Sequence, residues 1–330
     1  MGRDPFYDNA KFLLMALVIN GHAVEPLVGS HATVKSVYTF IYLFHMPCFV
    51  VLAGLLTKVR PGWAGLANST RRLLVPYVAF QILSWLFRWA FSPGGAGSFS
   101  LFTPDWVLWF LVSLFWWRAL LPLFVAVPFG LPLAVGLGLA VGVVDGIGSP
   151  LSLSRTFVFF PYFLAGHLAG QRRCVCPTPY WRVAGGVGLL VLAAVACFWG
   201  EGIDVRWFYG RTSYAELGIS PGSGVLARGG LYLVGVCGTV GFLALVSRKA
   251  TPFTALGANS LYAFLLHGFV IRFADWHGWY GLVLSPVIWM VLLLPLSIAL
   301  TVALSSSRVR RNTAPLVEPG QFRSVPRHAS

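Results

Sequence analysis

Hydrophobic residues along this chain are gathered into long runs, which short polar or glycine- and proline-containing segments separate. Each run has about 16 to 22 residues, close to the roughly 20 that an α-helix needs to cross a bilayer. The runs lie near residues 10–28, 37–57, 73–91, 106–125, 128–146, 156–171, 183–200, 226–246, 256–273 and 283–304. The pattern predicts an all-α integral membrane protein, built as a bundle of about ten transmembrane helices.

Composition agrees with a membrane setting, because 57% of the residues are hydrophobic and only 10% are charged. Soluble proteins have roughly a quarter charged residues. Little sequence remains for a soluble domain, so we expect one polytopic membrane domain over residues 1–304. Residues 305–330 are rich in arginine, proline and serine, and they predict a basic, disordered cytoplasmic tail. The first run lacks a small-residue cleavage site, so we expect it to remain as a helix.

The basic residues behind the net charge of +14 are divided unequally between the two membrane sides of the predicted bundle, which argues against a nucleic-acid-binding patch. With a cytoplasmic N-terminus, sixteen basic residues fall on the inner side: Arg3, Lys11, Lys58, Arg60, Arg71, Arg72, Arg172, Arg173, Arg182, Arg248, Lys249, Arg308, Arg310, Arg311, Arg323 and Arg327. Seven fall on the outer side: Lys35, Arg88, Arg155, Arg206, Arg211, Arg228 and Arg272. This excess is the positive-inside pattern. We predict a multi-pass protein of the plasma membrane, with both termini cytoplasmic and no nucleic-acid partner.

The first hydrophobic run contains a histidine, His22, and a lysine, Lys11, eleven residues before it. Eleven residues turn a helix about 20° past three full turns, so both side chains share one face, roughly 16 Å apart along the axis. Ionisable residues inside membrane helices are costly and mark functional sites by default. Asn20, Gly21 and Glu25 add polarity to the same end of the run.

Two further histidines, His45 and His267, fall at nearly the depth of His22. Helical rise places each of the three about 16 to 18 Å from the inner surface. His45 and His267 also have structural interpretations. His45 can bond a carbonyl group that the Pro47 kink frees, and His267 can bond a neighbouring helix. Cys174 and Cys176 are isolated from histidine, so no metal site is predicted.

Several motifs together carry a family resemblance. In chain order they are FYDNAK at residues 6–11, VINGH at 18–22, FHMPCF at 44–49 with Ala53-Gly54, RRLLVPY at 71–77, WFL at 109–111, and GANSLY at 257–262 with Leu266-His267. This series resembles the membrane-bound acyltransferase family 3, in particular its fucose 4-O-acetylase-like branch. Two positions depart from the family pattern, because Lys11 replaces a common arginine and Ala53 replaces a common serine.

The resemblance implies an O-acyltransferase. Such an enzyme takes an acyl group, typically acetyl, from cytoplasmic acyl-coenzyme A and passes it to a hydroxyl group at or beyond the outer face. The acceptor is usually a sugar, a polysaccharide or a glycosylated metabolite. Acetyl-coenzyme A is then a donor substrate, and no permanently bound cofactor is expected.

Physical chemistry assigns roles to the polar residues of such an enzyme. A sugar hydroxyl is a poor nucleophile, so acyl transfer needs a base, and the ordinary pKa of histidine suits that task. We assign His22 as the base, with Glu25 one turn away as its orienting partner. An acyl-histidine intermediate is the alternative. His267 or Asn259 is the candidate donor to the oxyanion, and His45, Asn259 and Trp109 are candidates for substrate or structural support.

The phosphates of coenzyme A require basic groups near the cytoplasmic surface. Lys11, Arg71 and Arg72 are the candidates, although Arg71 and Arg72 also suit ordinary anchoring at the inner interface. On the outer side, the loop over residues 200–227 carries the charged and aromatic residues Glu201, Asp204, Trp207, Tyr209 and Arg211. Such residues suit carbohydrate contacts, and they equally suit a surface loop that has no role in acceptor binding.

Two other functions remain open from the sequence. A proton-coupled transporter would also use ten spans with histidines near mid-membrane. However, the chain lacks a convincing internal repeat, and acidic residues are scarce inside its runs. A non-catalytic membrane scaffold predicts that replacing His22 has no effect on any rate.

Overall fold

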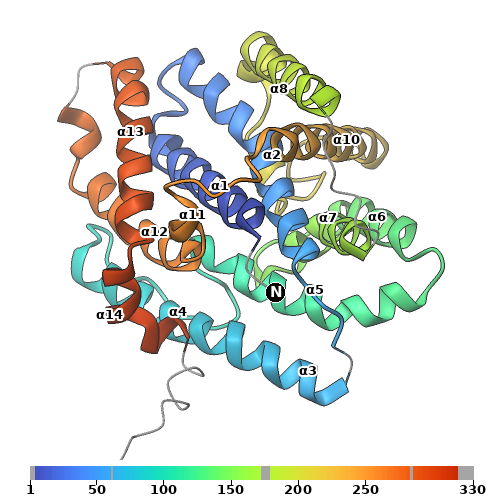
Figure 1. Ribbon diagram of the computed structural model, residues 1–330. Helices are drawn as coiled ribbons and strands as arrows, with labels where there is room; N and C mark the ends of the chain where they lie inside the picture. The colour runs from blue at the N-terminus through green and yellow to red at the C-terminus, as the bar shows by residue number, and fades with distance from the viewer. Residues whose placement is uncertain (1–3, 61, 172–178, 283–284, 319–330) are drawn as a thin grey trace, which may run out of the picture.

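The computed structural model describes residues 4–60, 62–171, 179–282 and 285–318 of the chain. Within these residues every regular element is helical (Figure 1). The long helices are α1 (Pro5–Val24), α2 (Ala32–Leu55), α4 (Val75–Phe91), α5 (Trp109–Ala126), α7 (Leu153–Gln171), α8 (Pro179–Trp199), α10 (Pro221–Leu245), α12 (Ser260–Trp276) and α13 (Pro286–Leu304). The shorter α-helices are α3 (Gly62–Ser69), α6 (Gly130–Ala140), α9 (Arg206–Tyr209), α11 (Thr254–Gly257) and α14 (Ser307–Val317). Single turns are η1 (Glu25–Leu27), η2 (Thr70–Leu74), η3 (Trp106–Leu108), η4 (Val141–Val143), η5 (Pro150–Ser152), η6 (Gly200–Gly202) and η7 (Trp279–Leu282).

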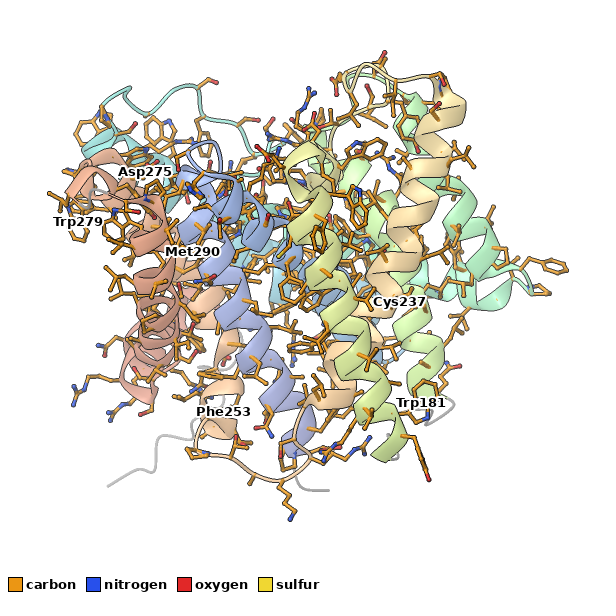
Figure 2. The ribbon with its side chains drawn as sticks, turned by 90° about the horizontal axis from the view of Figure 1, so that it is seen from above. Trp181, Cys237, Phe253, Asp275, Trp279 and Met290 are labelled. Atoms are coloured by element: carbon orange, nitrogen blue, oxygen red, sulfur yellow. The ribbon has the colours of Figure 1, made fainter. Side chains whose placement is uncertain are left out.

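The helices run between two ends of the bundle, which we name after His22 and Arg72. At the His22 end, Tyr280 donates to the Ala23 carbonyl and Lys35 to that of Glu201. At the Arg72 end, His167 donates to the Thr57 carbonyl over 2.8 Å. Figure 2 shows the His22 end at the top, marked by Asp275 and Trp279, with Phe253 and Trp181 at the opposite end.

Each of the ten predicted hydrophobic runs is largely occupied by helix. Seven helical segments of the described chain are long and apolar enough to span a membrane, so a count of ten spans stays a prediction. The other three runs correspond to α6 with η4, to α7 and to α12. The first covers only Gly130–Val143, about 21 Å at 1.5 Å per residue. The other two carry polar groups that face neighbouring helices rather than lipid, such as His167 and His267.

α1 and α2 form the centre of the bundle (Figure 1). In the apolar stretches of α1 and α2 that could span a membrane, 61% and 67% of the residues are buried. The corresponding shares are 22% for α8 and 17% for α13. α1 packs against α2, α11, α12 and α13, while α2 packs against α1, α7, α8 and α10. The outer helices present exposed Val, Leu and Ile side chains, such as Leu190 and Leu294, as a lipid environment requires. The candidate residues on α1 and α2 therefore lie inside the bundle.

Small residues allow α2 and α7 to approach closely. A Cβ atom on Gly54 would lie 2.0 Å from the Phe163 carbonyl oxygen, and one on Gly166 would lie 2.2 Å from that of Val51. Contacts of this kind are typical of helix pairs in membranes, where close backbone packing replaces the hydrophobic effect. Ala53 directly precedes Gly54 in the chain. One turn later, the Thr57 hydroxyl donates to the Ala53 carbonyl over 2.8 Å.

The FYDNAK motif has a structural role at the Arg72 end. The fully buried Asn9 side chain donates to the carbonyls of Ser247 and Lys249, both over 2.9 Å, and accepts from Thr251 and Thr254. It therefore ties the start of α1 to the segment that joins α10 to α11.

The prediction of a disordered tail after residue 304 is wrong for residues 307–317. These residues form α14, which Ser306 caps by accepting from the Val309 N–H, and which packs against α4, α12 and α13. Ala314 and Val317 are buried in that contact, while Arg308, Arg310 and Arg311 are exposed. Amphipathic packing orders the segment despite its low hydrophobicity. Residues 319–330, and with them Arg323 and Arg327, lie outside the described residues, as do Arg3, Arg172, Arg173, Cys174 and Cys176.

Candidate active site

His22 lies in the last turn of α1, where the chain continues as the 3₁₀ turn η1. Pro26 in this turn has no N–H to donate, which ends the α-helical pattern of hydrogen bonds. Glu25 follows His22 by three residues and lies on the same face. Nδ1 of His22 lies 3.3 Å from Oε2 of Glu25, and because a carboxylate only accepts, Nδ1–H is the donor. The structure thus brings together the predicted base and its predicted partner.

The Glu25 carboxylate is held in turn by a loop residue. The Tyr209 hydroxyl donates to Oε1 of Glu25 over 3.3 Å, and it lies 3.1 Å from the Tyr38 hydroxyl on α2. Burial raises the pKa of Tyr209 above its ordinary value, so this hydroxyl keeps its proton and remains a donor. Nδ1 of His22 also lies 3.4 Å from the Tyr42 hydroxyl. Within the described residues no protein group bonds Nε2 of His22, which leaves the lone pair of that nitrogen available.

Aromatic rings fix the plane of the His22 imidazole. The His267 ring stacks on it with centroids 5.5 Å apart, and the Trp106 ring meets it edge-on at 4.6 Å. Trp106 has a φ of +35°, a region that residues with a side chain rarely adopt. The Arg272 guanidinium carbon lies 4.9 Å from the centre of the Trp106 ring. Trp106 therefore contacts both His22 and Arg272.

His45 and His267 use their Nδ1 atoms differently from His22. Nδ1–H of His45 donates to the Ile41 carbonyl over 2.8 Å, and that of His267 donates to the Ala263 carbonyl over 2.9 Å. Both bonds stay within the residue's own helix, so neither the carbonyl freed by Pro47 nor a neighbouring helix is the partner. Nε2 of His267 is buried without a hydrogen-bond partner in the described chain. In the neutral ring this nitrogen is an acceptor, and it can donate to an oxyanion only when the ring is protonated.

A cavity of about 90 Å³ lies beside His22. It is lined by groups from separate parts of the chain: His22, Glu25, Tyr42, His45, Met46, Trp106, Trp109, Arg155, Phe208, Tyr209 and Arg211. The predicted support residues Trp109 and His45 are among them. The loop residues Tyr209 and Arg211 also reach this cavity, which brings the predicted carbohydrate-contact loop to the histidine.

A second cavity of about 280 Å³ shares the side chains of His22, Glu25 and Trp106. It lies at the end marked by Asp275 in Figure 2, a residue of its lining. Asp105 accepts from Arg272 over 2.6 Å and from Arg88 over 2.7 Å. These ion pairs tie the segment before Trp106 to α12 and α4, and they hold Trp106 between the two cavities.

Asn259 lies away from this site. It precedes α12, eight residues before His267, which is about 12 Å along a helix axis. Its Nδ2 atom donates to the Ser305 carbonyl over 3.0 Å and ties α12 to the end of α13. The structure therefore places Asn259 in a helix contact at the Arg72 end and not beside His22.

The Arg72 end has a basic pocket of about 480 Å³. Four cationic residues line it, Lys58, Arg60, Arg72 and Arg118, and Nε of Arg118 is buried without a hydrogen-bond partner in the described chain. Arg72 belongs to η2, a π-helical turn of the kind that often marks functional sites. Of the other two predicted coenzyme A ligands, Arg71 is exposed outside the pocket lining and Lys11 pairs with Asp8 over 2.6 Å.

Sequence reasoning did not assign Trp106, Tyr42, Arg155 or Arg118 to a site. Their signal was weak: Arg155 directly precedes a hydrophobic run, and Arg118 is a lone cation inside one. His167 has a structural role, because its side chain bonds to the Thr57 carbonyl and to the Gln171 side chain. No cluster of potential metal ligands occurs among the described residues.

This chain is similar to a known protein family and to one curated protein. A family model described as an acyltransferase domain matches residues 4–306. Nodulation protein NolL of Mesorhizobium japonicum is 34% identical over 93 residues, which are 26% of this chain. That similarity spans 25% of the relative's length. No solved structure matches the chain.

Proposed function

This chain belongs to acyltransferase family 3, and on that premise we propose that it is an O-acetyltransferase of the plasma membrane that modifies a sugar or glycan. The donor is cytoplasmic acetyl-coenzyme A, and the acceptor hydroxyl lies at the outer face. The family predicted from the motifs is confirmed, and its fucose 4-O-acetylase-like branch is part of the proposal. The observation that carries the proposal is a histidine with a carboxylate on Nδ1, an unpartnered Nε2 in the described chain and a cavity beside it.

His22 acts as the general base in this reaction. Its Nε2 takes the proton of the acceptor hydroxyl while the hydroxyl oxygen attacks the thioester carbonyl carbon. Glu25 stabilises the imidazolium that forms, because its carboxylate accepts from Nδ1–H. Collapse of the tetrahedral intermediate breaks the carbon–sulfur bond, and Nε2 returns the proton to the leaving thiolate. The products are the O-acetyl sugar and free coenzyme A.

The basic pocket at the Arg72 end binds the donor phosphates. Lys58, Arg60, Arg72 and Arg118 face one space of suitable size, and guanidinium groups bind phosphate in a bidentate manner. The Nε of Arg118, unpartnered within the described residues, gains an acceptor when a phosphate binds there. Trp63, which is 86% exposed at this pocket, offers its ring to the adenine base.

Two helices, α2 and α5, connect the donor pocket to the base. α2 and the residue after it carry His45 at the cavity and Leu56 at the pocket, about 16 Å apart by helical rise. α5 carries Arg118 and Trp109, about 14 Å apart by the same measure. A pantetheine arm that follows the α2–α5 contact passes the rings of Phe49 and Phe110, whose centroids are 5.6 Å apart.

The transporter alternative gains no support from the fold or the comparisons. The family model is that of an acyltransferase. In addition, His45 and His267 bond to carbonyls of their own helices. Such pairing supplies no relay of titratable groups across the described part of the bundle.

The test uses membranes that contain the wild-type protein, His22→Ala or the control His277→Ala. His277 is an exposed histidine at the same end of the bundle. The membranes are incubated with labelled acetyl-coenzyme A and a pool of cell-surface glycans, and label in the glycan fraction is counted. We expect labelling by the wild type and His277→Ala, and a loss of about 10²- to 10⁴-fold with His22→Ala. Near-normal labelling by His22→Ala, at equal expression, would remove His22 as the base.

A further inference from the structure

Two arginine side chains line the His22 cavity without a carboxylate partner. Neither Arg155 nor Arg211 forms an ion pair within the described residues. Among the described residues that line the cavity, Glu25 is the acidic one, and it pairs with His22. Nε of Arg155 donates to the Tyr209 carbonyl over 3.0 Å, and its guanidinium carbon lies 4.8 Å from the centre of the Trp109 ring. Its two terminal nitrogens have no protein partner in the described chain.

Another buried arginine shows what a purely structural role looks like. Both terminal nitrogens of Arg228 donate to backbone carbonyls, those of Gly138 and Thr212, at 3.4 and 3.3 Å. Its guanidinium also lies over the Tyr214 ring at 4.6 Å. Arg155 instead uses one nitrogen for the fold and leaves the other two toward the cavity.

The loop that carries Arg211 is built onto the start of α7. Ser154 donates to the Gly210 carbonyl over 2.8 Å, and Arg155 donates to that of Tyr209. Gly210 has a φ of +63°, and a Cβ atom there would lie 3.0 Å from the Phe159 ring. A glycine is therefore required for both the backbone angle and the close approach. The turn fixes Arg211, whose guanidinium carbon lies 5.6 Å from the centre of the Tyr209 ring, at the cavity shared with Arg155.

Aromatic side chains form the remaining walls of this space. Tyr42, Trp106, Trp109, Phe208 and Tyr209 all line it. Rings of this kind bind the apolar faces of sugars while polar groups fix orientation. With two guanidinium groups and one carboxylate, the cavity has one positive charge more than negative when His22 is neutral.

We propose that the acceptor is an anionic sugar, whose negatively charged group binds to Arg155 and Arg211 and so presents a hydroxyl to His22. The excess charge selects a single anionic group, either the carboxylate of a uronic acid or a phosphate ester. This inference rests on the proposed acetyltransferase function and names the acceptor class of the same site. Guanidinium groups suit both anions through paired N–H donors.

The first experiment measures transfer of labelled acetyl groups to matched acceptors. These are methyl β-D-glucuronide, its neutral methyl ester, methyl β-D-glucoside and glucose 6-phosphate. We expect the wild type to prefer at least one anionic acceptor by about 10- to 100-fold in kcat/KM, the range for hydrogen bonds to a charged group. Arg211→Gln removes most of this preference, because kcat/KM falls much further with the anionic acceptor than with methyl β-D-glucoside. The control Arg206→Gln, on the same loop but paired with Asp204 outside the cavity, keeps the preference.

The two acceptor arms distinguish the sources of charge. Preference for glucuronide alone assigns a carboxylate, and preference for glucose 6-phosphate alone assigns a phosphate. Equal use of charged and neutral acceptors by the wild type would overturn the inference. An equal loss with all acceptors in Arg155→Gln and Arg211→Gln would also overturn it, because the arginines would then act on the acyl group.

A binding measurement separates this inference from the proposed function. Tryptophan fluorescence of the purified protein, without acetyl-coenzyme A, is titrated with methyl β-D-glucuronide and with its methyl ester, since Trp106 and Trp109 line the cavity. Selective quenching by the anion that Arg211→Gln abolishes, together with no transfer, supports the acceptor class and rejects the acetyltransferase. His22-dependent transfer without charge selectivity in binding or turnover does the reverse.

Discussion

At the scale of single residues, three histidines of similar predicted depth differ in the partners of their Nδ1 atoms. A carbonyl acceptor, as for His45 and His267, fixes a neutral ring in place. A carboxylate acceptor, as for His22, also stabilises the protonated ring that a base must become. Depth alone does not distinguish these cases, and the hydrogen-bond partner does.

Glu25→Gln tests this distinction with little change in shape. The amide oxygen can still accept from Nδ1–H of His22, but it carries no charge to stabilise the imidazolium. We expect kcat to fall by about 10- to 100-fold with nearly unchanged KM values for donor and acceptor, the loss of one charged hydrogen bond. Steady-state kinetics in membranes provides the measurement, with the exposed Glu201→Gln as its control. A wild-type kcat in Glu25→Gln would show that the carboxylate has no part in the chemical step.

At the scale of helices, the α2–α7 contact positions both sides of the site. α2 carries Tyr42 and His45, while the first turn of α7 carries Ser154 and Arg155. Because Gly54 and Gly166 allow the backbones to touch, the two helices act as one unit.

Gly54→Ala should therefore destabilise the protein. The added Cβ would lie 2.0 Å from a backbone oxygen, which no rotamer change relieves. We expect a loss of about 1–3 kcal/mol, the usual cost of overpacking, seen as a lower melting temperature in detergent. Gly188→Ala on α8 is the matched control, since a Cβ atom added there would have nothing within 4 Å. Equal melting temperatures for the two variants would contradict the close-packed contact.

A separate prediction concerns donor binding by Arg72 on the π-helical turn η2 and by Arg118 on α5. Arg72→Gln and Arg118→Gln should each raise the KM for acetyl-coenzyme A by about tenfold or more, because each removes a charged contact to phosphate. Arg308→Gln, an exposed arginine on α14 at the same end, should leave this KM unchanged. Initial rates against donor concentration give the answer. A KM that is normal in both pocket variants would contradict donor binding in this pocket.

Much of the fold could be predicted from the sequence, because lipid exposure forces long apolar runs wherever a helix faces the bilayer. The i to i+3 spacing likewise predicted the His22–Glu25 pair. Contacts made by chain segments far apart were not predictable: Tyr209 on Glu25 depends on how a loop folds back, and Asn259 on Ser305 depends on helix ends meeting. α14 was missed because its order comes from packing, not from its own hydrophobicity.

At the scale of the whole molecule, the basic pocket and His22 lie at opposite ends of one bundle. A transfer across the membrane then requires the Arg72 end to face the cytoplasm, as the positive-inside distribution predicts. Reversed orientation would expose the basic pocket to a compartment without acyl-coenzyme A. Orientation is therefore a direct condition on the proposed mechanism.

Cysteine labelling on intact cells tests the orientation. In a background where the five natural cysteines are replaced, Glu201→Cys marks the His22 end and Lys249→Cys the Arg72 end, since both native side chains are exposed. A membrane-impermeant maleimide should label Glu201→Cys in intact cells and Lys249→Cys only after the cells are opened. The opposite pattern would place His22 in the cytoplasm, so that donor and acceptor could not approach from the two sides. Labelling of both positions in intact cells would mean that the bundle does not separate the two compartments as a membrane-spanning enzyme must.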